Sequence, residues 1–525
     1  MDKISVVVDR EAISLWKLRI IEFLVQKNQL QIIYVIENPK IDYSIDMKAF
    51  SCKGLSKISI HEEFEEIPRK QLQEAAMEED ILWLSEDKID NTKSTNIYYF
   101  SNSKCKQKTE NEYFKSEDFA ASNLTFLSRL SGGKAKVINY SWSEEARFSK
   151  NSTITTNLLS LSNLLINLNN IYQEPKLLNS EQSSLLKKNI IVRLYEKIYN
   201  LLFYFITWNI YSYSSEINFE ADERLDESQL NPLFNTSKWI FNADQHYLES
   251  VNSLLYENFN YFRGIGTLEK LSLETVASVP LATQENNTHY SYPNTFSFEN
   301  KDYVLPENAQ GNALNIYELK NNELHYVNTV SDSFSGIDPT IVCYKDKWYV
   351  FVTNGDQGSN SNLYIFYADN PLEDWKEHQL NPVKIDITTA RGGGSIISNG
   401  DDLIRPTQNC YPSYGTSIIF NKITELSPEK FSEISTGELK VEDSKTYKGI
   451  HTIAKSKTSY FVDLKIMQFF PFARVLSVLR SRIKNNQEGI EFGNSLFSRI
   501  VLLTFLFLFI LLMYFFGFSA LSQIN

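Results

Sequence analysis

Asp338 is the residue whose setting first suggests chemistry. It precedes Pro339 in the stretch SFSGIDPTIVCYKDKWYVFVTNG (residues 333–355), where two apolar runs flank the charged tripeptide at 345–347. An aspartate before a proline commonly caps a turn. A carboxylate at the mouth of an aromatic hairpin can instead contact a sugar. Which interpretation holds depends on the structural element in which Asp338 lies.

Stretches built like this one recur along the second half of the chain. Units begin at residues 291, 336, 390 and 449, each with a small-residue or proline entry, a strand, a polar turn and a second strand. A spacing of roughly 40–50 residues is typical of β-propeller blades. The upstream segments WIFNAD and FRGIGTLEKLSLETVASV are candidates for the remaining blade and its closure. We therefore predict an all-β five-bladed propeller over residues 226–470.

The first third has a different pattern, typical of an α/β module over residues 1–150. KISVVV and LQIIYVIEN are predicted strands, and residues 11–26 between them form a predicted amphipathic helix. No GxGxxG follows the first strand, so this Rossmann-like module lacks the dinucleotide-binding fingerprint. Residues 151–225 are predicted to be a helical linker. Charged residues near 193–197 make its long aromatic helix a poor membrane span.

The composition argues against several kinds of ligand. A formal net charge of −12 argues against nucleic acid, whose phosphates select basic surfaces. The four cysteines lie far apart without a CxxC spacing, so we expect neither a disulfide framework nor a structural zinc site. Together with the missing glycine fingerprint, this predicts no nicotinamide, flavin or metal cofactor.

The C-terminus carries a predicted membrane anchor. Residues 500–521 contain no charged side chain and, at 1.5 Å per residue, span about 33 Å as a helix, enough for the hydrocarbon core. A basic juxtamembrane segment, residues 471–499, precedes it, and no charged side chain follows. The positive-inside rule then predicts a single-pass anchor with the globular part in the cytoplasm.

Five short motifs in the second half resemble one family. They are Tyr292-Pro293, Pro306-Glu307, Asp338-Pro339, Arg405-Pro406-Thr407-Gln408 and Gly449-Ile450-His451-Thr452. The entry-strand-turn-strand pattern, with Asp338-Pro339 at an entry and YADNPLEDW (residues 367–375) closing the same unit, resembles five-bladed propeller glycosidases of family 43 type. The order of the five motifs resembles more closely the propeller domain of glucosamine inositolphosphorylceramide transferases and their bacterial relatives, over residues 235–466. The first third resembles the formyltransferase-like Rossmann module of those relatives, but it lacks their Asn-x-His, so formyl transfer is not expected.

The resemblance implies where the functional side chains lie. Propeller glycosidases place acidic residues from successive blade entries around an axial funnel, as a base, an acid and a residue that sets the pKa of the acid. The implied catalytic residues here are Asp338, Glu307, Asp463 and His451. The implied substrate-binding residues are His289, Tyr292, Arg391, Arg405 and Gln408. We expect Asp338, Glu307 and His451 to face one polar funnel.

Several of these residues also have a purely structural interpretation. Glu307 fits a solvated loop, His451 fits a buried core histidine, and Arg405 with Gln408 fits a structural hydrogen-bond pair. Arg391 precedes three glycines, whose backbone amides would help it to bind an anion, or which simply form a mobile loop.

One departure from the family bears on the reaction. Family 43 glycosidases carry an aspartate at the first blade entry, where this sequence has Ser291-Tyr292-Pro293, so on this alignment the base of a hydrolase is missing. We therefore expect a membrane-anchored, transferase-like protein acting on a sugar, nucleotide sugar or lipid-linked glycan in surface polysaccharide or glycolipid synthesis, with a glycosyltransferase as partner. The alternatives are a non-catalytic sugar-binding or scaffolding module and, third, a glycoside hydrolase.

Overall fold

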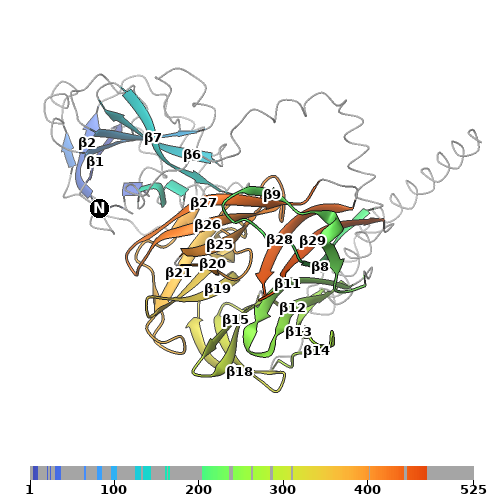
Figure 1. Ribbon diagram of the computed structural model, residues 1–525. Coiled ribbons are helices and arrows are strands. Elements are labelled where there is room, and N and C mark those ends of the chain that lie inside the picture. Colours follow the sequence, from blue (N-terminus) through green and yellow to red (C-terminus); the bar gives the residue numbers. More distant parts are fainter. Residues whose placement is uncertain are drawn as a thin grey trace, which may run out of the picture. The chain divides into compact units, whose positions relative to one another are not determined.

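The structure is a computed structural model (Figure 1). It describes residues 4–9, 20–21, 24, 30–36, 64–66, 80–84, 96–102, 124–131, 134–143, 160–161 and 163–165. It also describes residues 204–469 apart from 236–239, 262–263, 284–287, 309–310, 401 and 443–445. Among these residues no helix has the length and apolar character needed to cross a membrane. The predicted anchor at 500–521 and the basic segment at 471–499 lie outside the described residues.

The N-terminal residues form one seven-stranded sheet in the order β3-β2-β1-β4-β5-β6-β7. Its strands are β1 (Ile4–Asp9), β2 (Leu30–Ile36), β3 (Phe64–Glu66), β4 (Asp80–Trp83), β5 (Asn96–Asn102), β6 (Leu124–Ser131) and β7 (Lys134–Trp142). The first five are parallel, and β6 and β7 are antiparallel additions at one edge. Helical residues 20, 21 and 24 are buried. The parallel part has the 3-2-1-4-5 strand order that is found in doubly wound α/β folds.

Five further sheets, mainly antiparallel, contain the strands from residue 204 onward. One contains β10 (Leu230–Pro232), β8 (Tyr204–Tyr213), β29 (Tyr460–Phe469) and β28 (Tyr447–Lys455). The next two contain β11 (Ile240–Leu248), β12 (Ser253–Asn260), β13 (Ile265–Ser272) and β14 (Ser278–Pro280), then β15 (Tyr290–Phe298), β16 (Lys301–Asn308), β17 (Leu314–Lys320) and β18 (Glu323–Ser331).

The remaining two sheets follow in chain order. One contains β19 (Gly336–Tyr344), β20 (Lys347–Asn354), β21 (Asn362–Ala368), β22 (Lys376–Glu377) and β23 (Lys384–Ile385). The other contains β24 (Ile397–Asn399), β25 (Asp402–Asn409), β26 (Ser417–Leu426), β27 (Phe431–Lys440) and β9 (Asp222–Arg224). Short 3-10 turns lie at Glu227–Gln229, Glu249–Val251 and Gly355–Gln357.

The five sheets follow one another around a common centre (Figure 1). The first strands of consecutive sheets contact each other, β28 with β11, β11 with β15 and β15 with β19, and β25 contacts β28. Residues 392 and 394 bridge to Thr407 and Ile453 and so lie between the last two sheets. This arrangement is that of a five-bladed β-propeller, and its entries at 291, 336, 390 and 449 match the predicted unit starts.

The closure of the ring differs from the prediction. The segments WIFNAD and FRGIGTLEKLSLETVASV form β11, β13 and β14 of a blade, while β8 completes the sheet made by the last strands, β28 and β29. The predicted helical linker 151–225 is therefore wrong over residues 204–213. The aromatic run at 204–213 is apolar enough to form either a buried helix or a buried strand. It is a strand here because it pairs with β29, which is distant in sequence.

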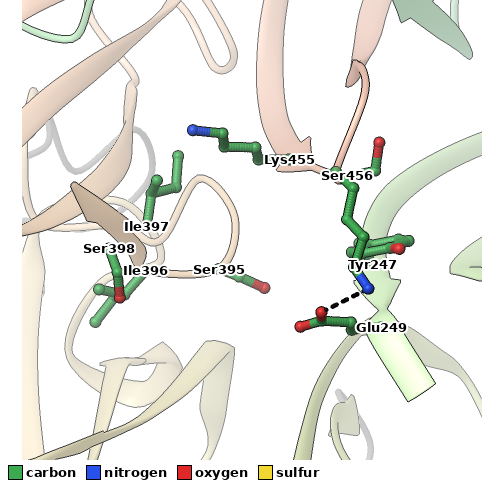
Figure 2. Close-up of a pocket in the computed structure, with 9 residues that line it drawn as sticks. Tyr247, Glu249, Ser395, Ile396, Ile397, Ser398, Lys455 and Ser456 are labelled. Carbon is green, nitrogen blue, oxygen red and sulfur yellow. Dashed lines mark ion pairs between the residues drawn. The ribbon is translucent and has the colours of Figure 1, made fainter. Parts of the chain in front are cut away.

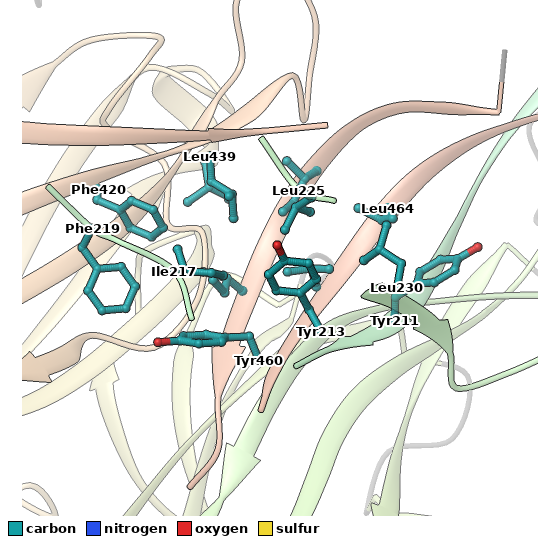
Figure 3. Packing of buried hydrophobic residues seen from close by; sticks show 14 of the residues in the cluster. Tyr211, Tyr213, Ile217, Phe219, Leu225, Leu230, Phe420, Leu439, Tyr460 and Leu464 are labelled. Atoms are coloured by element: carbon teal, nitrogen blue, oxygen red, sulfur yellow. The ribbon is translucent and has the colours of Figure 1, made fainter. Parts of the chain in front are cut away.

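The core consists of apolar clusters between neighbouring sheets. Figure 3 shows the cluster that surrounds the closing sheet, where aromatic rings of β8 pack with β26 and β29. Phe420, Val462 and Leu464 have no exposed surface there. Truncating such a side chain to alanine typically costs about 2–5 kcal/mol. This packing holds the first strands of the blades in place around the axis.

Candidate functional site

A β-bulge recurs at the same place in the first strand of four blades. The pairing register shifts between Ala243 and His246, Ser291 and Asn294, Ile337 and Thr340, and Ile450 and Ile453. The first bulge residues Asp244, Tyr292 and Asp338 adopt left-handed φ values of 55°, 45° and 48°. A bulge bends a strand and re-aims a side chain. Because these strands surround the axis, we expect Asp244, Tyr292, Asp338 and His451 to come together.

Asp338 lies in this bulge and is not a turn cap. Its side chain is 2% exposed, and its Oδ2 atom accepts hydrogen bonds from Arg391 Nε at 2.6 Å and Gln408 Nε2 at 2.7 Å. Its backbone N–H donates to Glu307 Oε2 at 3.1 Å. Glu307 is correspondingly buried in β16, so the loop interpretation of that residue is wrong.

His451 lies between two carboxylates. Its Nδ1 atom is 2.8 Å from Asp463 Oδ1, and its Nε2 atom is 3.1 Å from Asp244 Oδ1. Burial lowers the pKa of His451, but Asp463 and Asp244 outweigh this effect and raise the pKa to about 10. His451 is therefore an imidazolium at neutral pH. Asp244, His451 and Asp463 form a possible metal-ligand group, and a metal that bound there would displace the imidazolium proton.

Asp463 holds the backbone around Asp244 and His451 in place. Its side chain is fully buried, and it accepts hydrogen bonds from the backbone N–H groups of His451 (3.2 Å), Thr452 (2.8 Å) and Asp244 (3.0 Å). These contacts join β28 and β29 to the bulge of β11. The sequence pattern implied a catalytic role for Asp463, and the structure gives it this positioning environment.

The carboxyl groups of the cluster divide into two kinds. Burial would raise the pKa of Asp244, but the His451 charge outweighs it and holds the pKa below its usual value. Burial, and then the Asp338 charge, holds the pKa of Glu307 well above its usual value. Burial likewise raises the pKa of Glu257 on β12, and that of Asp338 although Arg391 opposes it. Such opposite shifts separate a base from an acid at one pH.

Arg391 connects the buried cluster to exposed loops. Its Nη1 atom donates to Ser359 O and Asn360 Oδ1, both at 3.1 Å, and its guanidinium lies 4.8 Å from the centre of the Tyr414 ring. Trp208 packs on His451 with ring centroids 3.9 Å apart. Aromatic rings and a fixed guanidinium thus border the carboxylates on this side. Flat rings of this kind also suit packing against the apolar face of a sugar.

The glycines after Arg391 do not form an anion-binding loop. A Cβ at Gly392 would lie 2.8 Å from Asp338 O, and one at Gly394, where φ is +132°, would lie 2.0 Å from Ile453 O. The Gly393 N–H donates to Pro406 O and the Gly394 N–H to the Tyr292 hydroxyl. The glycines are needed for close packing at the axis, and these two amides are already used.

Arg405 lies outside the cluster, in a separate ion-pair network. Its guanidinium binds Glu433 in a bidentate manner at 2.8 and 2.6 Å and donates to Ala390 O and Thr389 O. The predicted pairing of Arg405 with Gln408 is not observed, because Gln408 bonds Asp338 and Gly392 O. His289 lies at the edge of the cluster, where Nδ1 accepts from the Gly266 N–H and Nε2 is 3.7 Å from Glu257 Oε1. The Tyr292 side chain is fully buried.

Asp244, Glu257 and Trp208 were missed by the sequence interpretation. Asp244 occupies the bulge of the first complete blade, so the cluster does contain a carboxylate where Ser291-Tyr292-Pro293 implied that none remained. The sequence ADQHY (residues 243–247) has the polar pair Asp244-Gln245 where the later units have Tyr-Pro and Asp-Pro. This equivalent position is the signal that could have revealed Asp244. Trp208 lies in the segment predicted to be helical.

A separate hollow of about 250 Å³ lies elsewhere on the propeller. Figure 2 shows its lining residues, which come from the ends of β11 and β28 and from the segment 395–398. Lys457 there pairs with Glu249 at 3.0 Å. None of the carboxylates described above lines it, so this hollow and the carboxylate cluster are different sites.

The fold and the cluster define a β-propeller with acidic side chains at its axis. Residues 273–468 match a family model described as Glucosamine inositolphosphorylceramide transferase 1, N-terminal. The chain is 31% identical over 163 residues to glucosamine inositolphosphorylceramide transferase 1 of Oryza sativa subsp. japonica, covering 30% of this chain and 22% of that protein. It is 31% identical over 153 residues to the Arabidopsis thaliana protein of the same name, covering 28% and 20%. The chain is thus a distant relative that spans about a fifth of these proteins.

Solved structures with lower similarity include two sugar-active enzymes. An alpha-L-arabinofuranosidase from Podospora anserina is 8% identical with a TM-score of 0.34, covering 50% of this chain and 98% of that one. An exo-beta-1,3-galactanase from Clostridium thermocellum is 8% identical with a TM-score of 0.32, covering 46% and 64%. Values this low transfer no function to the present chain.

Proposed function

We propose that this chain is a transferase-like protein that acts on a glycan at the propeller axis. The observation that carries the proposal is one buried cluster in which, against the effect of burial, the His451 charge lowers the pKa of Asp244, while burial raises the pKa of Glu307. Two carboxyl groups with pKa values displaced in opposite directions are what cleavage of a glycosidic bond requires. The distant relationship to glucosamine inositolphosphorylceramide transferases supports a sugar, nucleotide sugar or lipid-linked glycan as ligand.

In the proposed reaction Glu307 is the acid and Asp244 the base. Glu307 donates its proton to the leaving glycosidic oxygen as the bond from the anomeric carbon breaks. Asp244 takes the proton of the attacking hydroxyl as the new bond forms. With a sugar or lipid hydroxyl as nucleophile the outcome is transfer, and with water it is hydrolysis. Trp208 and Tyr414 would border the bound glycan.

A second candidate function is sugar binding without turnover. It is favoured by the ion pairs that already occupy two of the carboxylates, Asp338 with Arg391 and Asp244 with His451. In that case the chain would hold a glycan for a partner glycosyltransferase. Measured turnover by the purified full chain separates the two candidates.

Replacing Asp338 with asparagine tests whether the cluster binds a glycan at all. Asparagine tolerates the left-handed φ of 48° but removes the charge that orients Arg391 and Gln408. A hydrogen bond to a charged group contributes about 1.5–3 kcal/mol, so we expect glycan affinity to fall at least about tenfold. Affinity would be measured on the full chain in detergent against a panel of soluble and lipid-linked saccharides.

The matched control for this variant is Asp369→Asn, which removes an exposed aspartate paired with Lys347. Because Asp338 is buried in an ion pair with Arg391, its replacement is also expected to destabilise the fold. Gln408→Met removes the hydrogen bond from Gln408 to Asp338 and keeps the Asp338–Arg391 ion pair, so no buried charge loses its partner. Unchanged glycan affinity in both folded variants would refute a ligand role for the cluster.

We also propose that residues 500–521 anchor the protein in a membrane with the propeller in the cytoplasm. Deleting all residues after Asn494 is expected to move the protein from the membrane pellet to the soluble fraction. The reason is that the deletion removes the uncharged 22-residue segment 500–521. Fractionation of cells expressing either form measures this. A truncated protein that still sediments with membranes would place the anchor elsewhere.

A further inference from the structure

The last strand of the N-terminal sheet makes direct contact with the propeller, and the two belong to one compact unit. Trp142, at the end of β7, forms a parallel bridge with Asp386, and the Ile387 N–H donates to Trp142 O at 2.7 Å. The Tyr140 hydroxyl donates to Asp386 Oδ2 at 2.6 Å, where the Asp386 side chain is buried. β7 therefore holds the propeller segment that follows β23 through both backbone and side-chain bonds.

This segment is a tight turn that leads directly to Arg391. The Ala390 N–H donates to Asp386 O at 2.9 Å. Asp386 Oδ1 accepts from the Thr388 N–H at 2.8 Å and from the Thr388 hydroxyl at 2.6 Å. Arg391 comes next in the chain, and its carbonyl accepts the Gln408 N–H at 3.0 Å. The guanidinium of the axial cluster thus follows a turn whose central carboxylate is bonded to the N-terminal sheet.

The same strand also supports the loop that carries Tyr414. The Trp142 and Tyr411 rings have their centroids 4.7 Å apart, and the Cys410 N–H donates to Ile387 O at 3.1 Å. Tyr414 packs against the apolar cluster that contains Trp142, Ile387 and Cys410. Its ring is the one that lies against the guanidinium of the axial cluster. Two side chains that border the carboxylates, one cationic and one aromatic, therefore rest on segments held by β7.

We infer that the N-terminal α/β module is part of the glycan-binding site, because β7 fixes Arg391 and Tyr414 in the positions that a bound glycan meets. Tyr140 and Trp142 act through the turn at 386–390 and the loop at 410–414, so they are positioning residues. A displacement of about 1 Å in a positioned group can cost about 100-fold in rate. This inference rests on the proposed glycan function and gives the N-terminal module a role in it that requires no reaction of its own.

The first test measures glycan affinity in variants of the full chain purified in detergent. Trp142→Ala should weaken binding of the tightest-binding saccharide of the panel at least about tenfold. Trp142→Phe, which keeps a ring beside Tyr411, should restore most of the loss. Tyr140→Phe removes one oxygen atom and with it the bond to Asp386, and it should weaken binding by a smaller factor.

The matched control is Leu127→Ala, which truncates a fully buried side chain of β6 in the same sheet. It should destabilise the sheet and leave glycan affinity unchanged. If Leu127→Ala weakens binding as much as Trp142→Ala does, the loss reflects stability alone and the inference is overturned. Wild-type affinity in folded Trp142→Ala and Tyr140→Phe would also overturn it, while leaving the glycan proposal intact.

The second test needs no saccharide. Amide hydrogen exchange of the full chain should be at least about tenfold faster over residues 386–391 and 410–414 in Trp142→Ala than in the wild type, because these segments lose their support. Exchange over 314–320, in β17, should not change. Unaltered exchange over both segments would overturn the inference. If the wild type binds no saccharide, the glycan proposal falls, and the exchange result alone decides whether β7 holds these segments. If Trp142→Ala does not fold, the milder Tyr140→Phe decides both tests.

Discussion

Replacing Arg405 with methionine is expected to lower the free energy of unfolding by about 3–5 kcal/mol, the usual cost of removing one partner from a buried ion pair. The side chains of Arg405 and Glu433 are 2% and 1% exposed. Without the arginine, Lys384 at 2.6 Å is the one cation left to Glu433 among the described residues. The carbonyl oxygens of Thr389 and Ala390 also lose their donor. Urea unfolding of the full chain, followed by tryptophan fluorescence, measures the change.

The matched control is Arg224→Met, which breaks the exposed pair of Arg224 with Glu442. Exposed pairs contribute little, so its effect should stay below about 1 kcal/mol. Removing both buried partners, as Arg405→Met with Glu433→Leu, should recover part of the loss, because no buried charge is left alone. A loss under about 1 kcal/mol for the single variant would contradict a structural role for Arg405.

The same ion pair makes the fold sensitive to acid. Burial alone would raise the pKa of Glu433, but Arg405 and then Lys384 outweigh it and lower the pKa to about 2. An unfolded glutamate has a pKa of about 4.3. The stabilisation is therefore complete above about pH 4.3 and is lost as the pH falls toward 2. The Arg405 variant should show less of this acid dependence.

Replacing Glu307 with glutamine is expected to lower glycan turnover by about 10²–10⁴-fold, the usual contribution of a general acid. Glutamine keeps the carbonyl that accepts the Asp338 N–H but cannot supply a proton. Burial, and then Asp338, raises the pKa of Glu307 and so favours its protonated form. An uncharged glutamine should therefore unfold at nearly the same denaturant concentration. Turnover would be measured with the tightest-binding saccharide of the panel.

The pH profile gives a second readout of the same variant. Wild-type turnover should fall as the pH rises through the raised pKa of Glu307, and fall again as the pH drops through the lowered pKa of Asp244. The glutamine variant should lose the alkaline decline and keep the acidic one. Glu323→Gln, at an exposed site on β18, is the control. Full turnover by Glu307→Gln would refute Glu307 as the general acid, whereas no turnover by the wild-type protein would leave the binding function as the better proposal.

The blade architecture could be predicted from the sequence because each blade is a local pattern. An entry, a strand, a polar turn and a second strand lie within a few tens of residues, so the starts at 291, 336, 390 and 449 could be identified without distant contacts. The same repetition placed Asp338, Tyr292 and His451 at equivalent positions. Strands that repeat around an axis must bring equivalent residues together.

The tertiary structure alone distinguished residues of the same type. Arg391 and Arg405 were both implied as substrate-binding residues, but Arg391 pairs with Asp338, 53 positions away, and Arg405 with Glu433, 28 positions away. Likewise β8 is a strand because it pairs with β29 near the other end of the propeller. Neither partner is visible in a local pattern.

The sequence by itself determined that five blades surround an axis bearing Asp338, Glu307 and His451. Only the tertiary structure showed that Asp244 pairs with His451 in the same cluster and that Asp463, on the other side of the His451 ring, is fully buried. The physical reason is that the ionisation of a carboxyl group depends on its burial and on the charges within a few ångströms of it. Those charges come from blades separated by as many as 219 residues of chain, and they meet only when the ring closes.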